Sequence, residues 1–156
     1  MFPHDLVEWH TIVWVSAEPR NSATDRLAIH VAELHRTADL PRSLYTEDFM
    51  SEDRRRVIGA PTADLEDFAR NRAVNKELGA VRGLTRRLLA VAGDRCCCVE
   101  HLSMYARGEE IEAIHVLQFD QSIERLRRLV IFDVDELDDA LAELHRLHAE
   151  TTAADC

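Results

Sequence analysis

The sequence has little glycine and proline, and it lacks any long run of apolar residues. Five Gly and four Pro among 156 residues argue against a collagen-like, low-complexity or linker-dominated chain. No apolar stretch approaches the roughly 20 residues that a membrane-spanning helix needs. The first residues also lack the basic region and the apolar core of a signal peptide. We therefore expect a cytoplasmic protein that does not span a membrane.

Basic charge is scarce as well. The chain has 29 acidic and 19 basic side chains, which gives a formal net charge of −10 at pH 7. A long phosphate backbone would be repelled unless the basic residues were tightly clustered. The basic stretch formed by Arg125, Arg127 and Arg128 is short and poor in aromatic residues. We therefore expect no nucleic-acid partner.

The four cysteines do not follow the spacing of a disulfide framework or of paired zinc ligands. Cys96, Cys97 and Cys98 are consecutive, and Cys156 stands apart from them. Neighbouring residues of a strand point to opposite faces, so Cys96 and Cys98 share one face and Cys97 lies on the other. We expect three buried thiols in a reducing compartment, and neither a metal nor a cofactor.

The first part of the chain has helical character. Segment 6–15 fits neither a helix nor a strand cleanly and stays unassigned. Ser22, followed by Asp25 three residues later, is typical of a capping box, and apolar residues then recur at helical spacing over 22–37. Pro41 suits the first turn of a short second helix, and a short strand is expected after it.

The second part changes from helical to extended character. Thr62 is a suitable N-cap for a third helix, which Gly79 ends, and a last amphipathic helix begins at Asp135. Between these helices, short separators suited to hairpins join four long apolar segments, which predicts an antiparallel meander. The four segments are Leu84 to Val91, Arg95 to Tyr105, Glu110 to Phe119 and Ile123 to Asp133.

These elements predict one α+β domain over 1–156, with a core of about 23–148 and an N-terminal extension at 1–21. We expect the helices to cover one face of a curved sheet. Apolar residues such as Ile114 and Val116 also lie on the other face of the third long strand, so that face needs a cover. A homodimer formed through this second face is the simplest cover.

Two local sequence strings, together with the order of the elements, resemble the nuclear transport factor-like (SnoaL-like) superfamily. The strings run from Leu44 to Arg55 and from Phe132 to Leu144, and the second resembles the end of SnoaL-like domains that actinobacteria append to larger proteins. The superfamily includes ketosteroid isomerase, scytalone dehydratase, limonene epoxide hydrolase and SnoaL-type polyketide cyclases. The resemblance implies a cone-shaped barrel in which N-terminal helices pack on a curved antiparallel sheet with a C-terminal helix.

The same resemblance implies an apolar pocket in which a few carboxylates, histidines or tyrosines transfer protons. The Asp, Arg and Asp set of the epoxide hydrolases falls on Val130, Leu102 and Met104 in this chain. None of these three residues has the required chemistry. The epoxide-opening set is therefore absent, although the fold it belongs to is expected.

His115 and Asp53 are the candidate catalytic residues. His115 belongs to an alternating apolar set that faces the pocket or core, and burial can tune the pKa of an imidazole there. A hydrogen-bonded core histidine would fit the same pattern. Asp53 and Arg55 share a face if 51–56 is extended, which pairs a possible base with a guanidinium for an anionic ligand. A solvated charge run at a sheet edge is the alternative.

Tyr45 and Glu100 are further candidates for ligand binding, together with Arg55 and His115. Tyr45 offers a phenolic donor near the mouth of the pocket, although a tyrosine in such a connection commonly packs with its hydroxyl in water. Glu100 and His101 are neighbours, so they face opposite sides of their strand. We expect Glu100 to line the pocket, since it shares a face with Cys98.

Two functions remain open at this point. The first is a module that binds a small apolar ligand or mediates dimerisation without a clear catalytic set. The second is a cofactor-free isomerase, dehydratase or polyketide-cyclase-type enzyme that uses Asp53 or His115 as a general base. The fold alone does not choose between them, because function depends on the site.

Overall fold

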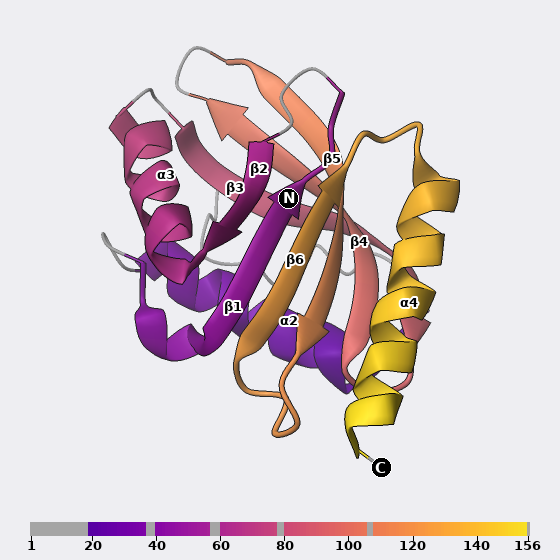
Figure 1. Cartoon of the computed structure of the whole chain (residues 1–156). Helices are drawn as coiled ribbons and strands as arrows, with labels where there is room; N and C mark the ends of the chain where they lie inside the picture. Colours follow the sequence, from indigo (N-terminus) through magenta and orange to yellow (C-terminus); the bar gives the residue numbers. More distant parts are fainter. Residues whose placement is uncertain (1–18, 37–39, 57–59, 78–79, 106–107, 156) are drawn as a thin grey trace, which may run out of the picture.

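The computed structural model describes residues 19–36, 40–56, 60–77, 80–105 and 108–155. These residues form an α+β fold of helices packed on a curved sheet (Figure 1). The elements are α2 (Ser22–Arg36), the short 3-10 helix η1 (Arg42–Leu44), β1 (Tyr45–Asp53), β2 (Ala60–Asp64), α3 (Leu65–Glu77), β3 (Ala80–Ala92), β4 (Cys96–Tyr105), β5 (Glu110–Phe119), β6 (Leu126–Phe132) and α4 (Leu137–Asp155).

The sheet confirms the predicted meander. Its six strands follow the order β2-β1-β6-β5-β4-β3, and strands β3 to β6 pair antiparallel with their neighbours in the chain. Strand β1 adds to the edge of the meander by pairing parallel to β6, and β2 pairs antiparallel to β1. The register between β3 and β4 shifts at three places. Irregularities of this kind bend strands and increase their twist, which is consistent with the strong curvature of this part of the sheet.

Helix α2 begins one residue away from the predicted capping box. Asn21, rather than Ser22, caps the helix: its Oδ1 accepts a hydrogen bond from the Thr24 amide at 2.9 Å, and the Thr24 hydroxyl accepts one from the Asn21 amide at 3.0 Å. The Asn21 side-chain amide also donates to the carbonyls of Gly93 and Cys96, both at 2.9 Å. Asn21 therefore fastens the start of α2 to the turn between β3 and β4.

Helix α3 begins later than predicted. The residues around Thr62 form β2, and Asp64 caps the helix by accepting a hydrogen bond from the Asp67 amide at 2.9 Å. Strand pairing with β1 therefore overrides the N-cap preference of Thr62. Gly79, the predicted end of this helix, lies outside the described residues, as does segment 6–15.

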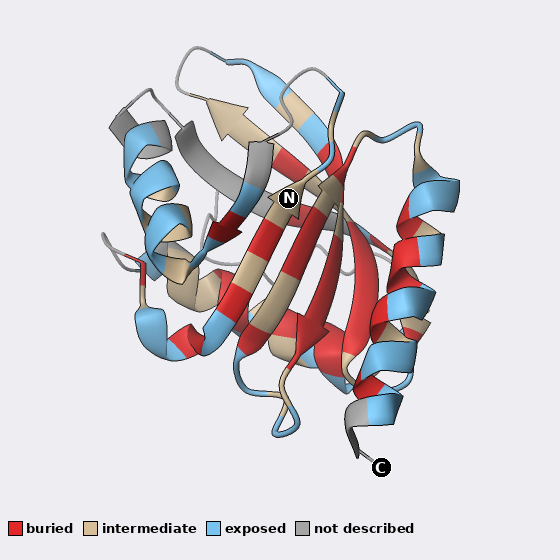
Figure 2. Ribbon diagram, in the orientation of Figure 1, coloured by how far each residue is buried: buried red, intermediate tan, exposed pale blue. Residues whose placement is uncertain are grey.

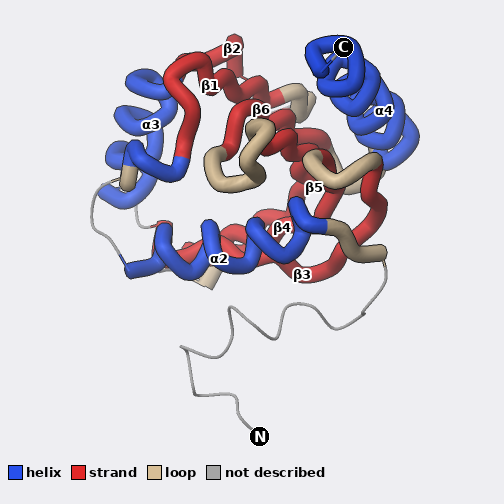
Figure 3. The backbone as a smooth tube through the Cα atoms, turned by 90° about the horizontal axis from the view of Figure 1, so that it is seen from below, coloured by secondary structure: helices blue, strands red, loops and turns tan. Residues whose placement is uncertain are grey.

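The helices cover both faces of the sheet, so the prediction that they cover only one face was wrong. Helices α2 and α3 lie against the concave face, where Val99 and Leu117 belong to the same buried cluster as Leu27 of α2. Helix α4 lies on the opposite side of the sheet from α3 (Figure 3). Its apolar stripe contains Ala140, Leu144 and Leu147, each fully buried. Figure 2 shows this buried stripe of α4 turned toward the buried strands.

The face assigned to a homodimer is therefore the face that α4 covers. Val116 is completely buried and belongs to one cluster with Leu144 and Leu147. Both faces of the sheet are apolar, as the sequence pattern predicts, but the chain supplies the cover itself. A homodimer stays a prediction without an assigned surface. The same two clusters confirm the alternation of the cysteines, with Cys97 on the concave face and Cys96 and Cys98 under α4.

Candidate functional site

The concave face carries a row of residues that strand register places side by side. Asp53 of β1 pairs with Ile131 of β6, Ile131 pairs with His115 of β5, and His115 pairs with Val99 of β4. Directly paired residues point to the same face of a sheet. Adjacent strands lie about 4.8 Å apart, so Asp53 and His115 are separated by about 10 Å across the sheet. The register thus brings both candidate catalytic residues to one surface.

Asp53 and Arg55 form a bidentate ion pair on this surface. The Arg55 Nη2 lies 2.6 Å from Asp53 Oδ2, and its Nε lies 2.9 Å from Asp53 Oδ1. The two side chains are only 15–16% exposed. The hydrogen bonds to Asp53 raise the pKa of Arg55 above its ordinary value, against the opposing effect of burial. The alternative of a solvated charge run at a sheet edge does not describe this pair, because β1 lies between β2 and β6.

His115 stacks on His101, the neighbouring histidine of β4. The ring centroids are 4.2 Å apart, and the rings are inclined by 15°. Burial lowers the pKa of His115 well below its ordinary value, with smaller electrostatic contributions from His101 and Arg55. His115 is therefore neutral at pH 7, and one of its ring nitrogens is available as an acceptor.

Two further groups act on Arg55 from the same end of the sheet. Tyr105 at the end of β4 and Asp133 just after β6 both favour the charged form of the guanidinium. A guanidinium that stays charged and a neutral imidazole can hold a carbonyl oxygen and accept a proton from the carbon next to it. We call His101, His115, Asp53 and Arg55 the outer polar cluster.

Glu100 does not belong to this cluster, which corrects the prediction that it lines the pocket. It pairs with Ile114, on the face opposite His115, and its nearest described charge partner is Arg87 at 3.8 Å. His101 is the neighbour that shares a face with His115. The register of the β4–β5 hairpin decides which of the two residues faces His115. Hydrogen bonds around Gly108 close the turn of this hairpin, and the resulting register pairs His101 with Ala113. The sequence predicted the hairpin but not its register.

Tyr45 lies at the inner end of the concave face and not at a wet mouth, so that prediction was also wrong. It is 3% exposed, and its hydroxyl lies 3.2 Å from His30 Nε2. Burial raises the pKa of Tyr45 above its ordinary value. Burial, together with the charges of Arg26 and Arg72, lowers the pKa of His30 to about 4. His30 was missed in the sequence, although it falls on the apolar stripe of its helix between Leu27 and Leu34.

One group of carboxylates in the described residues has the spacing of a metal site. Ligand oxygens of Asp133, Asp135 and Glu136 lie within 4.8 Å of one another. Arg56 already forms ion pairs with all three, at 3.7, 2.9 and 3.3 Å. Arg56 therefore offsets part of the negative charge, and the group is better described as an ion-pair network that ties the end of β1 to the start of α4. Within the described residues, no helix is long and apolar enough to span a membrane.

The comparisons with known proteins show the fold. No model of a protein family matches the sequence, and no curated protein matches it. The structure is similar to a protein of unknown function with a cystatin-like fold from Methylobium petroleophilum, with a TM-score of 0.57, 10% identity, and coverage of 72% of this chain and 76% of that one.

Two further similar structures have described activities. A putative polyketide cyclase from Xanthomonas campestris matches with a TM-score of 0.52 and 12% identity over 79% of this chain and 96% of its own. The pinacolase BvnE from Penicillium brevicompactum matches with a TM-score of 0.50 and 16% identity over 84% and 98%. The cone-shaped α+β fold that the sequence resemblance implied is thereby confirmed. Identities this low show the fold alone.

The lowered pKa of His30 predicts a loss of stability in weak acid. Between pH 6.5 and about 4 the unfolded chain binds a proton at this residue that the folded chain does not, so the free energy of unfolding falls as pH falls through this window. From pH 7.5 to pH 5, His30 alone accounts for about 2 kcal/mol of this loss. Urea denaturation at the two pH values measures it.

The variant His30→Gln isolates this contribution. It is expected to reduce the difference between the two pH values by about that amount. His145→Gln, which removes an exposed imidazole from α4, is the matched control. An identical pH dependence in the wild type and in His30→Gln would show that the His30 imidazole is accessible to water in the folded state.

Proposed function

We propose that this chain binds a small, mainly apolar molecule against the concave face, with the outer polar cluster contacting a polar group of that molecule. The observation that carries the proposal is the stacked pair of His115 and His101 beside the Asp53–Arg55 ion pair. The inner part of this face is apolar, with Val99, Leu117 and other buried residues. A few polar groups at the end of an apolar surface are typical of small-molecule sites.

The energetics support a function rather than a purely structural role for these polar groups. Apolar side chains in their place would avoid the cost of desolvating an imidazole and an ion pair. A largely buried ion pair of this kind contributes little to net stability, because desolvation offsets the attraction between the charges. A ligand that accepts hydrogen bonds from Arg55 and donates to His115 would recover part of that cost on binding.

The second candidate function is cofactor-free acid–base catalysis at the same cluster. The specific observation in its favour is that His115 is neutral at pH 7 and lies within the electrostatic influence of Arg55. A neutral imidazole can remove a proton next to a carbonyl, and the guanidinium stabilises the enolate oxygen that forms. Two proteins of similar fold are a putative polyketide cyclase and a pinacolase, which makes an enzyme a natural alternative.

We also infer a cytoplasmic location and, as a possible partner, a second copy of the chain. The three buried thiols Cys96, Cys97 and Cys98 are unpaired, which suits a reducing compartment. Burial raises the pKa of the Cys96 thiol to about 11 and that of Cys98 to about 12, so these thiols are inert. Light scattering at micromolar concentration measures the oligomeric state.

The neutral fluorophore N-phenyl-1-naphthylamine tests the binding proposal. We expect saturable binding of one molecule per chain, detected as a rise in fluorescence when the probe leaves water. Ala113→Trp should weaken this binding by roughly tenfold or more, because Ala113 is 3% exposed and pairs with His101, so an indole there occupies the space beside the histidine pair.

The matched control is Val134→Trp, which adds the same indole at a residue that is 48% exposed. Circular dichroism establishes that both variants are folded. The binding proposal fails if the wild type shows no saturable binding, or if Ala113→Trp binds the probe as well as the control does.

Exchange of the α-protons of 2-tetralone in D₂O, followed by proton NMR, tests the catalytic alternative. If His115 acts as a general base, His115→Gln slows the catalysed exchange by about 100-fold or more, the scale expected for loss of such a base. Asp53→Asn is the paired variant and identifies which of the two residues removes the proton. Exchange no faster than in buffer containing free imidazole would contradict catalysis while leaving the binding proposal intact.

A further inference from the structure

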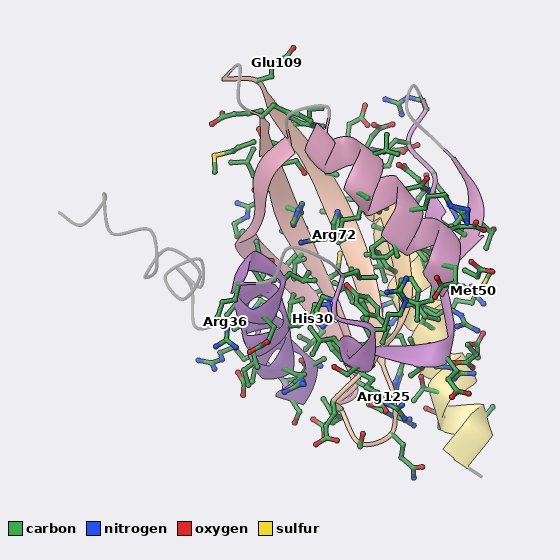
Figure 4. All side chains as sticks on the ribbon, turned by 90° about the vertical axis from the view of Figure 1, so that its left-hand side faces the viewer. His30, Arg36, Met50, Arg72, Glu109 and Arg125 are labelled. Atoms are coloured by element: carbon green, nitrogen blue, oxygen red, sulfur yellow. The ribbon has the colours of Figure 1, made fainter. Side chains whose placement is uncertain are left out.

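A second group of polar side chains lies deeper on the concave face, between α2, α3 and the start of β1. His30 of α2 is 2% exposed and is paired through Nε2 with the hydroxyl of Tyr45. Arg72 of α3 extends to α2, where its Nη2 donates to the Leu34 carbonyl at 3.0 Å. Figure 4 shows His30 and Arg72 in the interior, on the side of the sheet that α2 and α3 cover. We call His30, Tyr45 and Arg72 the inner polar cluster.

Two atoms of this cluster are buried without a hydrogen-bond partner. They are Nδ1 of His30 and Nε of Arg72, and neither finds a partner among the described residues. No carboxylate of the described residues forms an ion pair with Arg72 either, whereas the neighbouring Arg70 is paired with Asp67 at 2.7 Å. Burying a polar atom without a partner is costly, and native structures rarely contain such atoms without a reason.

The chemistry of these atoms indicates what would satisfy them. The Nε of an arginine is always a donor, and the guanidinium is always charged. If the Tyr45 hydroxyl donates to Nε2 of a neutral His30 ring, Nδ1 carries the ring proton and is a donor as well. Two N–H donors beside a positive charge that pairs with no carboxylate of the described residues are complementary to the oxygens of a carboxylate ligand.

The surroundings of the cluster are apolar and aromatic. The Tyr45 ring packs edge-on against Phe49, with centroids 4.9 Å apart, and His30 lies 6.2 Å from Phe119 in the same manner. Phe68 of α3 completes this group at 5.8 Å from Tyr45. A carboxylate bound here would therefore be followed by an apolar body. Along β5, Phe119 and His115 are four residues apart, a distance of about 13 Å.

We infer that the inner polar cluster binds the carboxylate of a medium-chain carboxylic acid, through Arg72 and His30, and that the apolar body of this acid extends along β5 toward His115. The inference rests on the proposed binding function and specifies its ligand class. The outer polar cluster then contacts the far end of the same molecule. Acetate is too short to occupy both ends, so a chain of intermediate length is the appropriate probe.

Isothermal titration calorimetry with octanoate and with octan-1-ol tests this assignment. The two probes share an apolar chain and differ in the charged group. The wild type should bind octanoate at least tenfold more tightly than octan-1-ol at pH 7.5. Arg72→Met should remove this preference, and Arg72→Lys should retain part of it, since a lysine keeps the charge but not the guanidinium geometry.

Arg70→Met is the matched control, because Arg70 lies on the same helix, is 64% exposed and is paired with Asp67. It should leave both affinities unchanged. NMR locates the bound carboxylate. The ring nitrogen resonances of His30 are assigned by their loss in His30→Gln; octanoate should shift these resonances, and Arg70→Met should not alter this shift. Circular dichroism of each variant separates a lost fold from a lost site.

The outcomes separate this inference from the proposed function. Equal affinity for octanoate and octan-1-ol, or an unchanged preference in Arg72→Met, overturns the carboxylate assignment while octan-1-ol binding still supports an apolar ligand site. If Arg70→Met reduces the preference for octanoate as much as Arg72→Met does, the preference reflects only a general attraction to positive charge. That result also overturns the carboxylate assignment. No binding of octanoate to the wild type overturns the inference outright, and the neutral fluorophore then decides the proposed function independently.

Discussion

The structure depends on how the two apolar faces of one curved sheet are covered. Strands β4 to β6 carry apolar side chains on both sides, so neither face can be left in water. Helix α4 covers the convex face with a fully buried stripe, and Arg54 and Arg146 surround the buried carboxylate of Glu143 at its edge. The hydrogen bonds that these two arginines donate to Glu143, together with their positive charges, lower the pKa of Glu143 against the effect of burial. The chain itself covers most of this face, and an open cavity of about 420 Å³ remains at the edge of α4 beside Arg54, Phe132 and Arg146.

The concave face is covered differently. Helices α2 and α3 lie over its inner part, and polar groups occur both there and at the outer end. The outer polar cluster contains groups that satisfy one another, such as Asp53 with Arg55. The inner polar cluster contains atoms that find no partner among the described residues. Buried polar atoms without a partner among the described residues occur on both faces, because Gln118 Oε1 under α4 is one of them. We propose the concave face as the functional surface because two such atoms, His30 Nδ1 and Arg72 Nε, belong to one cluster there.

Most of the fold was predictable from local sequence. The meander followed from four apolar segments with short separators, and β5 has the predicted bounds. The errors share one physical origin, which is that tertiary pairing overrides local preference. Thr62 was assigned to a helix start, yet pairing with β1 extends this segment. The stripe of α4 was recognised, but nothing in that stripe indicates which face of the sheet it covers.

The site was predictable only in part, for the same reason. Alternation placed His115 on the concave face, because a period of two is a local property. It did not place Arg55, because β1 ends at Asp53 and Arg55 lies beyond the strand, joined to Asp53 by an ion pair. The choice between Glu100 and His101 required the register of the β4–β5 hairpin, which is not local. His30 lies on the apolar stripe of α2, and a polar residue in such a stripe is the sequence signal for it. Its pairing with Tyr45 and its position near Arg72 required the packing of α2 against α3.

The central claim is that the concave face holds a small molecule. Native mass spectrometry of the protein purified without denaturation measures this most directly. The account predicts a fraction of chains with the added mass of one small molecule, which is released on denaturation and absent from Ala113→Trp. The bare mass of the polypeptide for the wild type, or the same added mass on both proteins, would contradict it.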